Sequence, residues 1–345
     1  MKRPWLVFAE HSNTTRNVSW PIGASRTLLG RITTNQAAAS AMKLIQETNN
    51  NEDDTAPNYQ PVEIDLVRAL QKRYPEQPQH VDGDTCSWND DFYHAMRVVY
   101  QTYPNDLDVC AIFVESILNR TPWKLWDLRT GQPAQDAYTG EAVRVMEQLF
   151  AAEDSNSAWH HFGLLHMHVH LMEMSPTPEQ ALRQGDALFA LAKDTDAGHL
   201  LHMPTHLDVL CGNYATVVTR NQAAVVADRK YRQCAGEDNF YTLYRCHNLH
   251  FVVYGALFAG QLTPALEAAD ELVSSLPETL LRKLPDWFEA FVPLKQHVWI
   301  RFGRWSDILD QALPQDKDMY CVTMATMRYA RVVALANIND EKSNR

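Results

Sequence analysis

Histidine dominates the residues of this sequence that could do chemistry. Ten of the 14 histidines fall in residues 160–250, where an even distribution would place about four. Two pairs, His166/His170 and His202/His206, have the four-residue spacing of neighbours on one helix face. Two such imidazoles can bind one transition-metal ion at metal–nitrogen distances of about 2.0–2.1 Å. The spacing therefore predicts metal binding if both pairs lie on helices.

Turn-forming residues give the histidines a common register. Gly212, Gly260 and Gly303 each follow a helix-sized apolar stretch and precede another, and Pro176 fits the same pattern. Counted back from these turns, eight histidines occupy only the positions 13, 10 and 6 residues before the turn. Because these positions differ by three and four, they share one helix face, and stacked helices would bring them together. The histidines in this register are His166, His170, His199, His202, His206, His247, His250 and His297.

The predicted site has more ligands than one ion needs. A nitrogen-rich set without thiolates suits Cu, Fe or Zn, and it argues against Mg and Ca, which prefer oxygen ligands. Either the site is dinuclear or some of the histidines orient the others. Glu173, at the third position before the turn at Pro176, is the predicted general base if the metal activates water. The predicted metal ligands are His166, His170, His199, His202, His206, His247 and His250.

Three more side chains are predicted to contact a substrate. Tyr254 occupies the position six residues before a turn, Tyr244 precedes the HNLHF segment, and His297 lies one helix pair further along. Pro204 leaves two alternatives open, because an internal proline ends a helix or bends it. If the helix begins at Pro204, the register of the two preceding histidines fails.

The remaining pattern is helical. Glycine is scarce (13 residues) and strand-like alternation is nearly absent, whereas Ala, Leu, Glu, Gln and Arg recur at spacings of three and four. A polar linker is expected over 49–61, and the Trp-rich segment 121–133 is expected to form a turn whose main role is packing. Helices are predicted over 22–48, 62–74, 90–103, 106–119 and 139–152.

From about residue 158 the chain resembles the tetratricopeptide-repeat family. The segments GNYATVV, GQLTPAL and GRWSDIL each place a small residue at a turn and apolar residues two and five positions later. The resemblance implies an all-α, right-handed superhelix of antiparallel helix pairs. It also implies that the first helix of each pair lines a concave groove, so that the histidines converge there. The expected organisation is an N-terminal segment and linker over 1–60, degenerate helix pairs over 61–157, and repeats over 158–337.

A narrower resemblance covers residues 158–260. It is to a poorly characterised group of proteins that share HxxxHxxE, GHLxHMPxH and HNxHF motifs. Here these motifs read HMHVHLME (166–173), GHLLHMPTH (198–206) and HNLHF (247–251). The resemblance supports a shared site but implies no particular reaction.

Composition excludes several classes of function. The formal net charge of −11 argues against nucleic-acid binding. No run of 18 apolar residues is present to span a membrane, and the six cysteines form no CxxC motif, so we expect free thiols in a cytoplasmic protein. The sequence also lacks GxSxG, Walker A, GxGxxG and HExxH motifs.

The leading hypothesis is a metal-dependent enzyme that acts on a small molecule. Oxygen activation or redox chemistry at Cu or Fe is slightly favoured, and a zinc-type hydrolase or lyase is the alternative among enzymes. A different class remains open, in which the groove binds a peptide or partner protein without catalysis.

Overall fold

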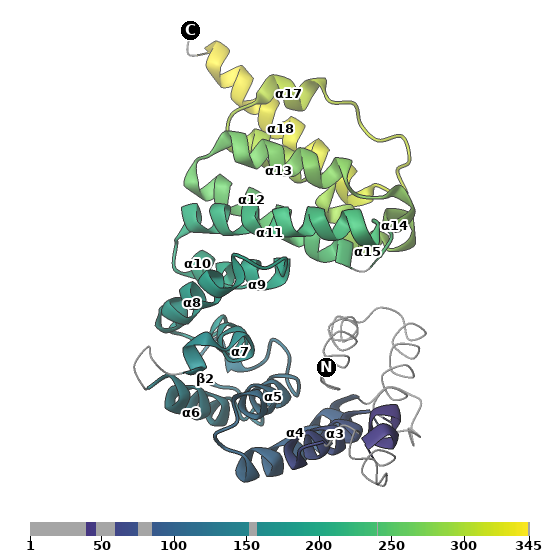
Figure 1. The fold of residues 1–345 in the computed structure, drawn as a ribbon. Coiled ribbons are helices and arrows are strands. Elements are labelled where there is room, and N and C mark those ends of the chain that lie inside the picture. Colours follow the sequence, from purple (N-terminus) through teal and green to yellow (C-terminus); the bar gives the residue numbers. More distant parts are fainter. Residues whose placement is uncertain (1–38, 46–58, 75–84, 152–156, 240, 344–345) are drawn as a thin grey trace. The chain divides into compact units, whose positions relative to one another are not determined.

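The chain is helical throughout the part that the structure describes. The structure is a computed structural model, and within it the only strands are two of two residues each. The predicted all-α class is thereby confirmed. The helices form two compact units, Met1–Pro176 and Thr177–Arg345 (Figure 1). The described residues are 39–45, 59–74, 85–151, 157–239 and 241–343.

The first unit packs its helices mostly in sequence order. Its elements are α3 (Pro61–Arg73), α4 (Thr85–Thr102), α5 (Leu107–Leu118), β1 (Trp126–Asp127), β2 (Gln132–Pro133), α6 (Thr139–Phe150), the 3-10 turn η2 (Ser157–His160) and α7 (Phe162–Met172). α4 packs against α3 and α5, and α7 packs against α5 and α6. The four helices predicted between 62 and 152 therefore exist, with ends shifted by a few residues.

The Trp-rich segment 121–133 forms a small hairpin instead of a simple turn. Trp126 pairs with Pro133 and Asp127 with Gln132 in an antiparallel ladder. The indole Nε1 of Trp126 donates a hydrogen bond to the carbonyl of Leu171 on α7 (2.7 Å). The predicted packing role is therefore correct for Trp126, and the strands were missed because two residues are too few to show alternation.

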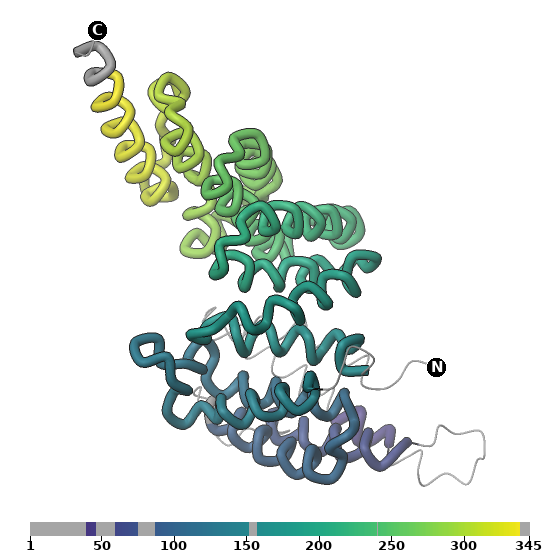
Figure 2. The backbone as a smooth tube through the Cα atoms, turned by 90° about the vertical axis from the view of Figure 1, so that its left-hand side faces the viewer, coloured from purple at the N-terminus to yellow at the C-terminus, as the bar shows by residue number. Residues whose placement is uncertain are grey.

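The second unit contains the larger share of the histidine-rich sequence. Its elements are η3 (Pro178–Ala181), α8 (Leu182–Ala192), α9 (Gly198–His202), α10 (Thr205–Leu210), α11 (Tyr214–Ala235), α12 (Tyr241–Ala259), α13 (Leu262–Ser274), α14 (Glu278–Lys283), α15 (Pro285–Phe288), η4 (Glu289–Phe291), α16 (Leu294–Arg301), α17 (Trp305–Asp310) and α18 (Cys321–Ser343). Consecutive long helices pack on one another, α11 on α12 and α12 on α13 (Figure 1). The tube in Figure 2 shows the same layering of helices within this unit.

The three predicted turn glycines have the backbone conformation that makes them turns. Gly212, Gly260 and Gly303 have φ of 78°, 69° and 65°, a region that residues with a Cβ atom rarely adopt. Each separates two helices, α10 from α11, α12 from α13, and α16 from α17. Each of these glycines therefore forms a turn between two consecutive helices, at the position that the sequence predicted.

Some predictions fall outside the described residues. Of the predicted helix 22–48 only 39–45 is described, and that stretch is helical; most of the linker 49–61 is not described. The observed units divide after Pro176, whereas the repeat segment was predicted to start at 158. Among the described residues, none of the helices combines the length and apolarity needed to cross a membrane.

Candidate metal centre

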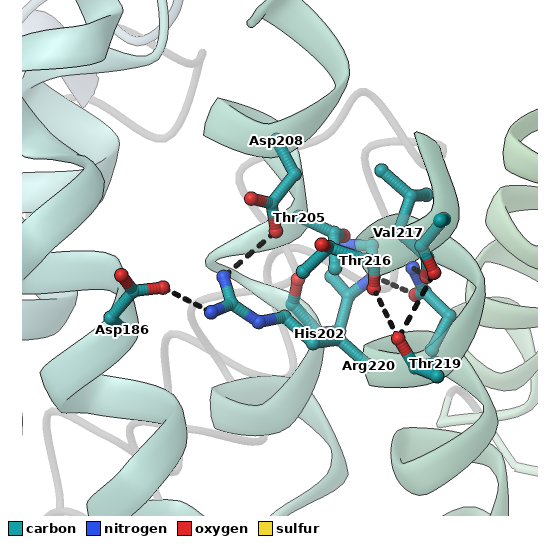
Figure 3. Close-up of polar contacts among 10 residues, drawn as sticks. Asp186, His202, Thr205, Asp208, Thr216, Val217, Thr219 and Arg220 are labelled. Atoms are coloured by element: carbon teal, nitrogen blue, oxygen red, sulfur yellow. Dashed lines mark hydrogen bonds and ion pairs between the residues drawn. The ribbon is translucent and has the colours of Figure 1, made fainter. Parts of the chain in front are cut away.

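Pro204 lies between two short helices in the segment that carries the GHLLHMPTH motif. Between α9 and α10, Met203 and Pro204 keep right-handed helical angles (φ −51°, ψ −41° and φ −57°, ψ −24°). Because proline donates no hydrogen bond, the regular ladder is interrupted, and the amide of His206 bonds the carbonyl of Met203 (3.2 Å). The hydroxyl of Thr205 donates to the carbonyl of His202 (2.7 Å; Figure 3). Of the two alternatives for Pro204, the structure therefore has the helix boundary, because α9 ends at His202 and α10 begins at Thr205. The helical angles of the two residues between them still keep His202 beside His206.

Three imidazoles, which we call the His triad, meet in the second unit. The Nε2 atoms of His202 and His206 lie 2.9 Å apart. The ring of His247 on α12 lies 4.7 Å from that of His202 and 5.9 Å from that of His206, between centroids. One nitrogen from each ring lies within 4.8 Å of the other two. Two nitrogens 2.9 Å apart on one ion subtend an angle of about 90° at ordinary bond lengths, so the spacing of His202 and His206 is compatible with a shared ion.

Asn221 on α11 orients the first member of the His triad. Its Nδ2 donates to the carbonyl of Val217 (2.8 Å), which turns its Oδ1 toward the Nδ1 of His202, 2.6 Å away. An amide oxygen can only accept, so the proton of neutral His202 is on Nδ1. The lone pair is then on Nε2, the atom that faces His206. Asn221 was not among the predicted site residues. In the sequence it is marked only as an amide within the Ala- and Val-rich sequence of α11.

Burial keeps His202 in the form that binds metal. His202 is only 1% exposed. Burial first, and then the neighbouring His247 and His206, hold the pKa of His202 well below its ordinary value, although the bond to Asn221 acts in the opposite direction. A neutral imidazole is the ligand form, so this residue needs no deprotonation near neutral pH.

Phe251 covers the His triad on one side. Its ring centroid lies 4.7 Å from that of His202, 5.1 Å from that of His206 and 4.6 Å from that of His247. The ring planes of Phe251 and His202 meet at 78°, an edge-on contact, and those of Phe251 and His206 meet at 28°, which is nearly stacked. An apolar ring at this place excludes water from part of the site, which strengthens electrostatic interactions inside it.

His250 does not belong to the His triad, contrary to its place in the predicted cluster. Its ring lies 5.9 Å from that of Phe291 in η4, and burial, followed by the neighbouring His297, lowers its pKa. The reason is helical geometry. From His247, a residue four positions on is rotated by about 40° and one three positions on by about 60° the other way. Phe251 thus reaches His202 and His206, and His250 turns aside.

His199 sits beside the His triad, in contact with an aromatic side chain of α12. Its ring centroid is 6.4 Å from that of His202 and 5.5 Å from that of Tyr244, edge-on at 81°. Burial raises the pKa of Tyr244 above its ordinary value, so the phenol remains protonated. Tyr244 was predicted to contact substrate, and it lies where it could donate a hydrogen bond next to the centre. Tyr254 instead stacks on Phe258, with centroids 4.8 Å apart.

A buried carboxylate holds the start of α9 in place. Asp228 is 1% exposed and accepts hydrogen bonds from the hydroxyl of Tyr241 (2.7 Å) and the amide of Asn248 (2.8 Å). Burial raises its pKa, and the bonds from Tyr241 and Asn248 act against that rise. Gly198, the first residue of α9, packs so closely that a Cβ there would lie 2.3 Å from Oδ1 of Asp228. Asp228 therefore supports the backbone before His199.

A second buried carboxylate fixes α10. Asp208 accepts from the guanidinium of Arg220 on α11 (2.8 Å), and the same guanidinium also pairs with Asp186 on α8 (Figure 3). Burial raises the pKa of Asp208 and the Arg220 charge counters that effect. Asp208 is thus tied to Arg220, and it is Asn221, the residue after Arg220, that bonds a histidine of the triad.

The first unit holds the other predicted pair. The rings of His166 and His170 on α7 lie 4.7 Å apart. Oε1 of Glu173, the predicted general base, lies 2.9 Å from Nδ1 of His170 and accepts a hydrogen bond from it. A carboxylate in this position orients an imidazole and leaves its Nε2 for other partners. His161 caps α7, since its Nδ1 accepts from the amide of Leu164 (3.2 Å).

The cysteines near the histidine motifs are protonated thiols. Cys246 is fully buried, and burial raises its pKa to about 12. Burial also raises the pKa of the partly exposed Cys211. Since the thiolate is the nucleophile, neither environment favours nucleophilic catalysis.

Comparison with known proteins adds no relative. The chain matches no protein-family model, no curated protein and no solved structure.

Proposed function

We propose that this protein binds a transition-metal ion through His202, His206 and His247 and is a metal-dependent enzyme. The observation that carries the proposal is the convergence of three imidazoles whose nitrogens lie within 4.8 Å of one another. Burial and Asn221 prepare one of them as a neutral ligand with its lone pair directed into the group. Orienting an imidazole through its other nitrogen is the usual arrangement in metal sites.

The donor set limits the choice of metal. Three imidazoles without a carboxylate or thiolate suit Cu or Zn, and they depart from the two-histidine, one-carboxylate set of many non-haem iron enzymes. Three protein ligands also leave a coordination position open, as catalytic sites do and closed structural sites do not.

For the reaction, our first proposal is an oxidoreductase or oxygenase that acts on a small molecule. For this reaction class we propose copper ahead of iron as the bound metal. A bound redox-active ion would supply electron transfer or oxygen activation there. A zinc-type hydrolase or lyase is the second proposal, favoured by the resemblance of three histidines and an open position to catalytic zinc sites. Tyr244, beside His199, is a hydrogen-bond donor to substrate in either case.

We also propose that the helix pairs belong to a tetratricopeptide-like, right-handed superhelix. The support is the recurrence of a positive-φ glycine between the two helices of three pairs, at Gly212, Gly260 and Gly303. Nearest-neighbour packing in such arrays leaves one face of each first helix available for a site.

Metal analysis of the full, untagged chain tests the function. After reconstitution with Cu²⁺, Fe²⁺ or Zn²⁺ and gel filtration, mass spectrometry should find about one tightly held ion per chain. The electron paramagnetic resonance spectrum of a copper-loaded sample should show hyperfine splitting from nitrogen ligands. His206→Ala and His247→Ala should each reduce metal affinity by at least about tenfold.

Matched variants sharpen the test. His250→Ala and His297→Ala remove imidazoles from α12 and α16 that lie outside the His triad, and both should retain the ion. Metal loading that survives in His206→Ala and His247→Ala, or a stoichiometry near zero in the native chain, would refute the proposal. In that case a non-catalytic helical scaffold that binds a peptide or protein becomes the better reading.

A further inference from the structure

A second site lies far along the chain from the His triad, within the second unit. A cavity of about 610 Å³ is lined by residues of α13, α16, α17, the connection that follows α17, and α18. Its volume falls in the range of about 300–1,000 Å³ that is usual for small-molecule sites. Figure 1 shows the connection from α17 to α18 as a long loop beside these helices. None of the histidines of the triad lines this cavity.

Two buried polar groups at the cavity have unused hydrogen-bonding capacity. Gln296 on α16 is 1% exposed; its Nε2 donates to Oε1 of Gln311, and its own Oε1 has no partner among the described residues. Thr323 on α18 is 3% exposed, and its hydroxyl is likewise without a partner in the described part of the chain. Buried polar atoms in native proteins are nearly always satisfied, by protein or by ordered water, so both atoms offer a hydrogen bond to a polar ligand or to water in the cavity.

The surrounding groups are mainly acceptors. Asp307 and Asp310 on α17 line the cavity. Asp307 is paired with Arg304, whereas the exposed Asp310 has no ion pair among the residues that the structure describes. Lys295 is the cation of the lining, and it is already engaged by Asp270 (2.5 Å). A ligand that satisfies Gln296 Oε1 and Asp310 must therefore bring donors and positive charge.

Aromatic side chains complete the lining. The ammonium of Lys295 lies 5.0 Å from the ring centroid of Trp299, which demonstrates that this indole accepts a cation on its face. Tyr320 also lines the cavity. Aromatic rings combined with carboxylates are the groups that recognise organic ammonium ions.

We propose that this cavity binds a small organic cation, an ammonium or guanidinium group carried on an apolar body. The cationic group is recognised by Asp310 and by the side-chain oxygen of Gln296, and the apolar body packs between Trp299 and Tyr320. The site is independent of the His triad and of any metal bound there.

Binding of two amines and a neutral analogue tests the proposal. Tyramine and agmatine are titrated by calorimetry into the full chain, in metal-free and metal-loaded form, and 4-ethylphenol serves as the neutral counterpart of tyramine. We expect at least one amine to bind with millimolar or better affinity in both forms. For tyramine we expect an affinity at least about tenfold above that of 4-ethylphenol, a difference that corresponds to about 1.4 kcal/mol.

Variants locate the site. Asp310→Asn, at an exposed position, should fold normally and weaken amine binding about tenfold, and Gln296→Leu should abolish it if that variant folds. Asp194→Asn removes the same charge from an exposed residue that does not line the cavity. This control variant should leave amine binding unchanged. Absence of binding by both amines, equal binding of 4-ethylphenol, or equal effects of Asp310→Asn and Asp194→Asn would overturn the proposal.

Discussion

The side chain of Asn221 determines which nitrogen of His202 is available to a ligand. The 2.6 Å contact between Asn221 Oδ1 and His202 Nδ1, together with the bond from Asn221 Nδ2 to the Val217 carbonyl, leaves one neutral tautomer of the histidine. The lone pair then lies on Nε2, which is 2.9 Å from Nε2 of His206 and can accept a hydrogen bond from it. One amide on α11 thus connects the packing of the helices to the chemistry of the centre.

Replacing this amide should weaken metal binding more than folding. Asn221→Ala should lower metal affinity by about ten- to a hundredfold, the usual effect of losing a group that orients a ligand. Asn221→Asp keeps an acceptor for Nδ1 and should restore most of the affinity. Metal titrations against a competing chelator measure both variants.

Asn248→Ala is the matched control for this prediction. Asn248 is equally buried, at 1%, but bonds Asp228 and not a histidine of the triad. Asn248→Ala should cost comparable stability and lower metal affinity less than Asn221→Ala does, because it removes no contact with a histidine of the triad. If Asn248→Ala and Asn221→Ala weaken the metal equally, the effect comes from general loosening of α11 and α12.

The sequence predicted those parts of the site that lie close together along the chain. His202 and His206, four residues apart, lie side by side although α9 ends at His202 and α10 begins at Thr205, and the turn glycines lie where their spacing indicated. Contacts between helices were harder to predict. A fixed count from Gly260 selected His247, His250 and Tyr254, whereas the side of α12 that contacts the histidines of α9 and α10 carries Tyr244, His247 and Phe251.

The misplacement of His250 has a simple cause. A register counted from the turn assumes that every helix presents the same rotation to its neighbour, but the rotation is set by packing of the whole side-chain surface. Asn221 could not be found from the motif spacing at all, because it lies on the second helix of its pair, and its role depends on the two bonds made by its amide.

Gly198 should be intolerant of a side chain. An added Cβ would lie 2.3 Å from Oδ1 of Asp228 and 2.8 Å from the hydroxyl of Tyr241, so α9 or the buried network must shift. Gly198→Ala should therefore cost about 1–3 kcal/mol of unfolding free energy, as overpacking of a buried site does. Urea unfolding measures the loss, and metal affinity should fall with it because α9 carries His202.

Gly185→Ala provides the comparison on α8. There the closest atoms to an added Cβ are 3.4 Å away, which is ordinary contact at the limit of close packing. Alanine in a helix interior is favoured over glycine by about 1 kcal/mol, so this variant should be neutral or more stable. A Gly198→Ala protein as stable as Gly185→Ala would show that α9 adapts without cost.

Arg220 should matter more for stability than the exposed arginine pairs. Its guanidinium, buried against Asp208, compensates a carboxylate that is 2% exposed (Figure 3). Arg220→Leu leaves Asp208 buried and unpaired and should cost about 3–5 kcal/mol. Combining it with Asp208→Leu should recover much of that loss, because replacing both charges by apolar groups removes the unpaired charge.

Arg229→Leu is the control for this pair. Arg229 on α11 bonds Glu271 but its side chain is 52% exposed, so solvent screens the interaction. Its loss should cost less than about 1 kcal/mol. Equal destabilisation by Arg220→Leu and Arg229→Leu, measured by chemical unfolding at neutral pH, contradicts the role assigned to the buried pair.

His168 should make the metal-free protein sensitive to acid. Its Nδ1 is buried without a partner in the described part of the chain, and its ring packs on Phe150 (centroids 5.3 Å apart). Burial lowers its pKa from 6.5 to about 4. The unfolded chain therefore takes up a proton below pH 6.5 that the folded chain refuses until about pH 4. The stability from this residue is complete above pH 6.5 and is lost as the pH falls to about 4, by up to roughly 3 kcal/mol.

Unfolding free energies of His168→Phe, measured with chelator present, should fall less steeply over this range than those of the native chain. Replacing the exposed His94 by Phe should leave the slope unchanged, and equal slopes in all three proteins would contradict the assignment.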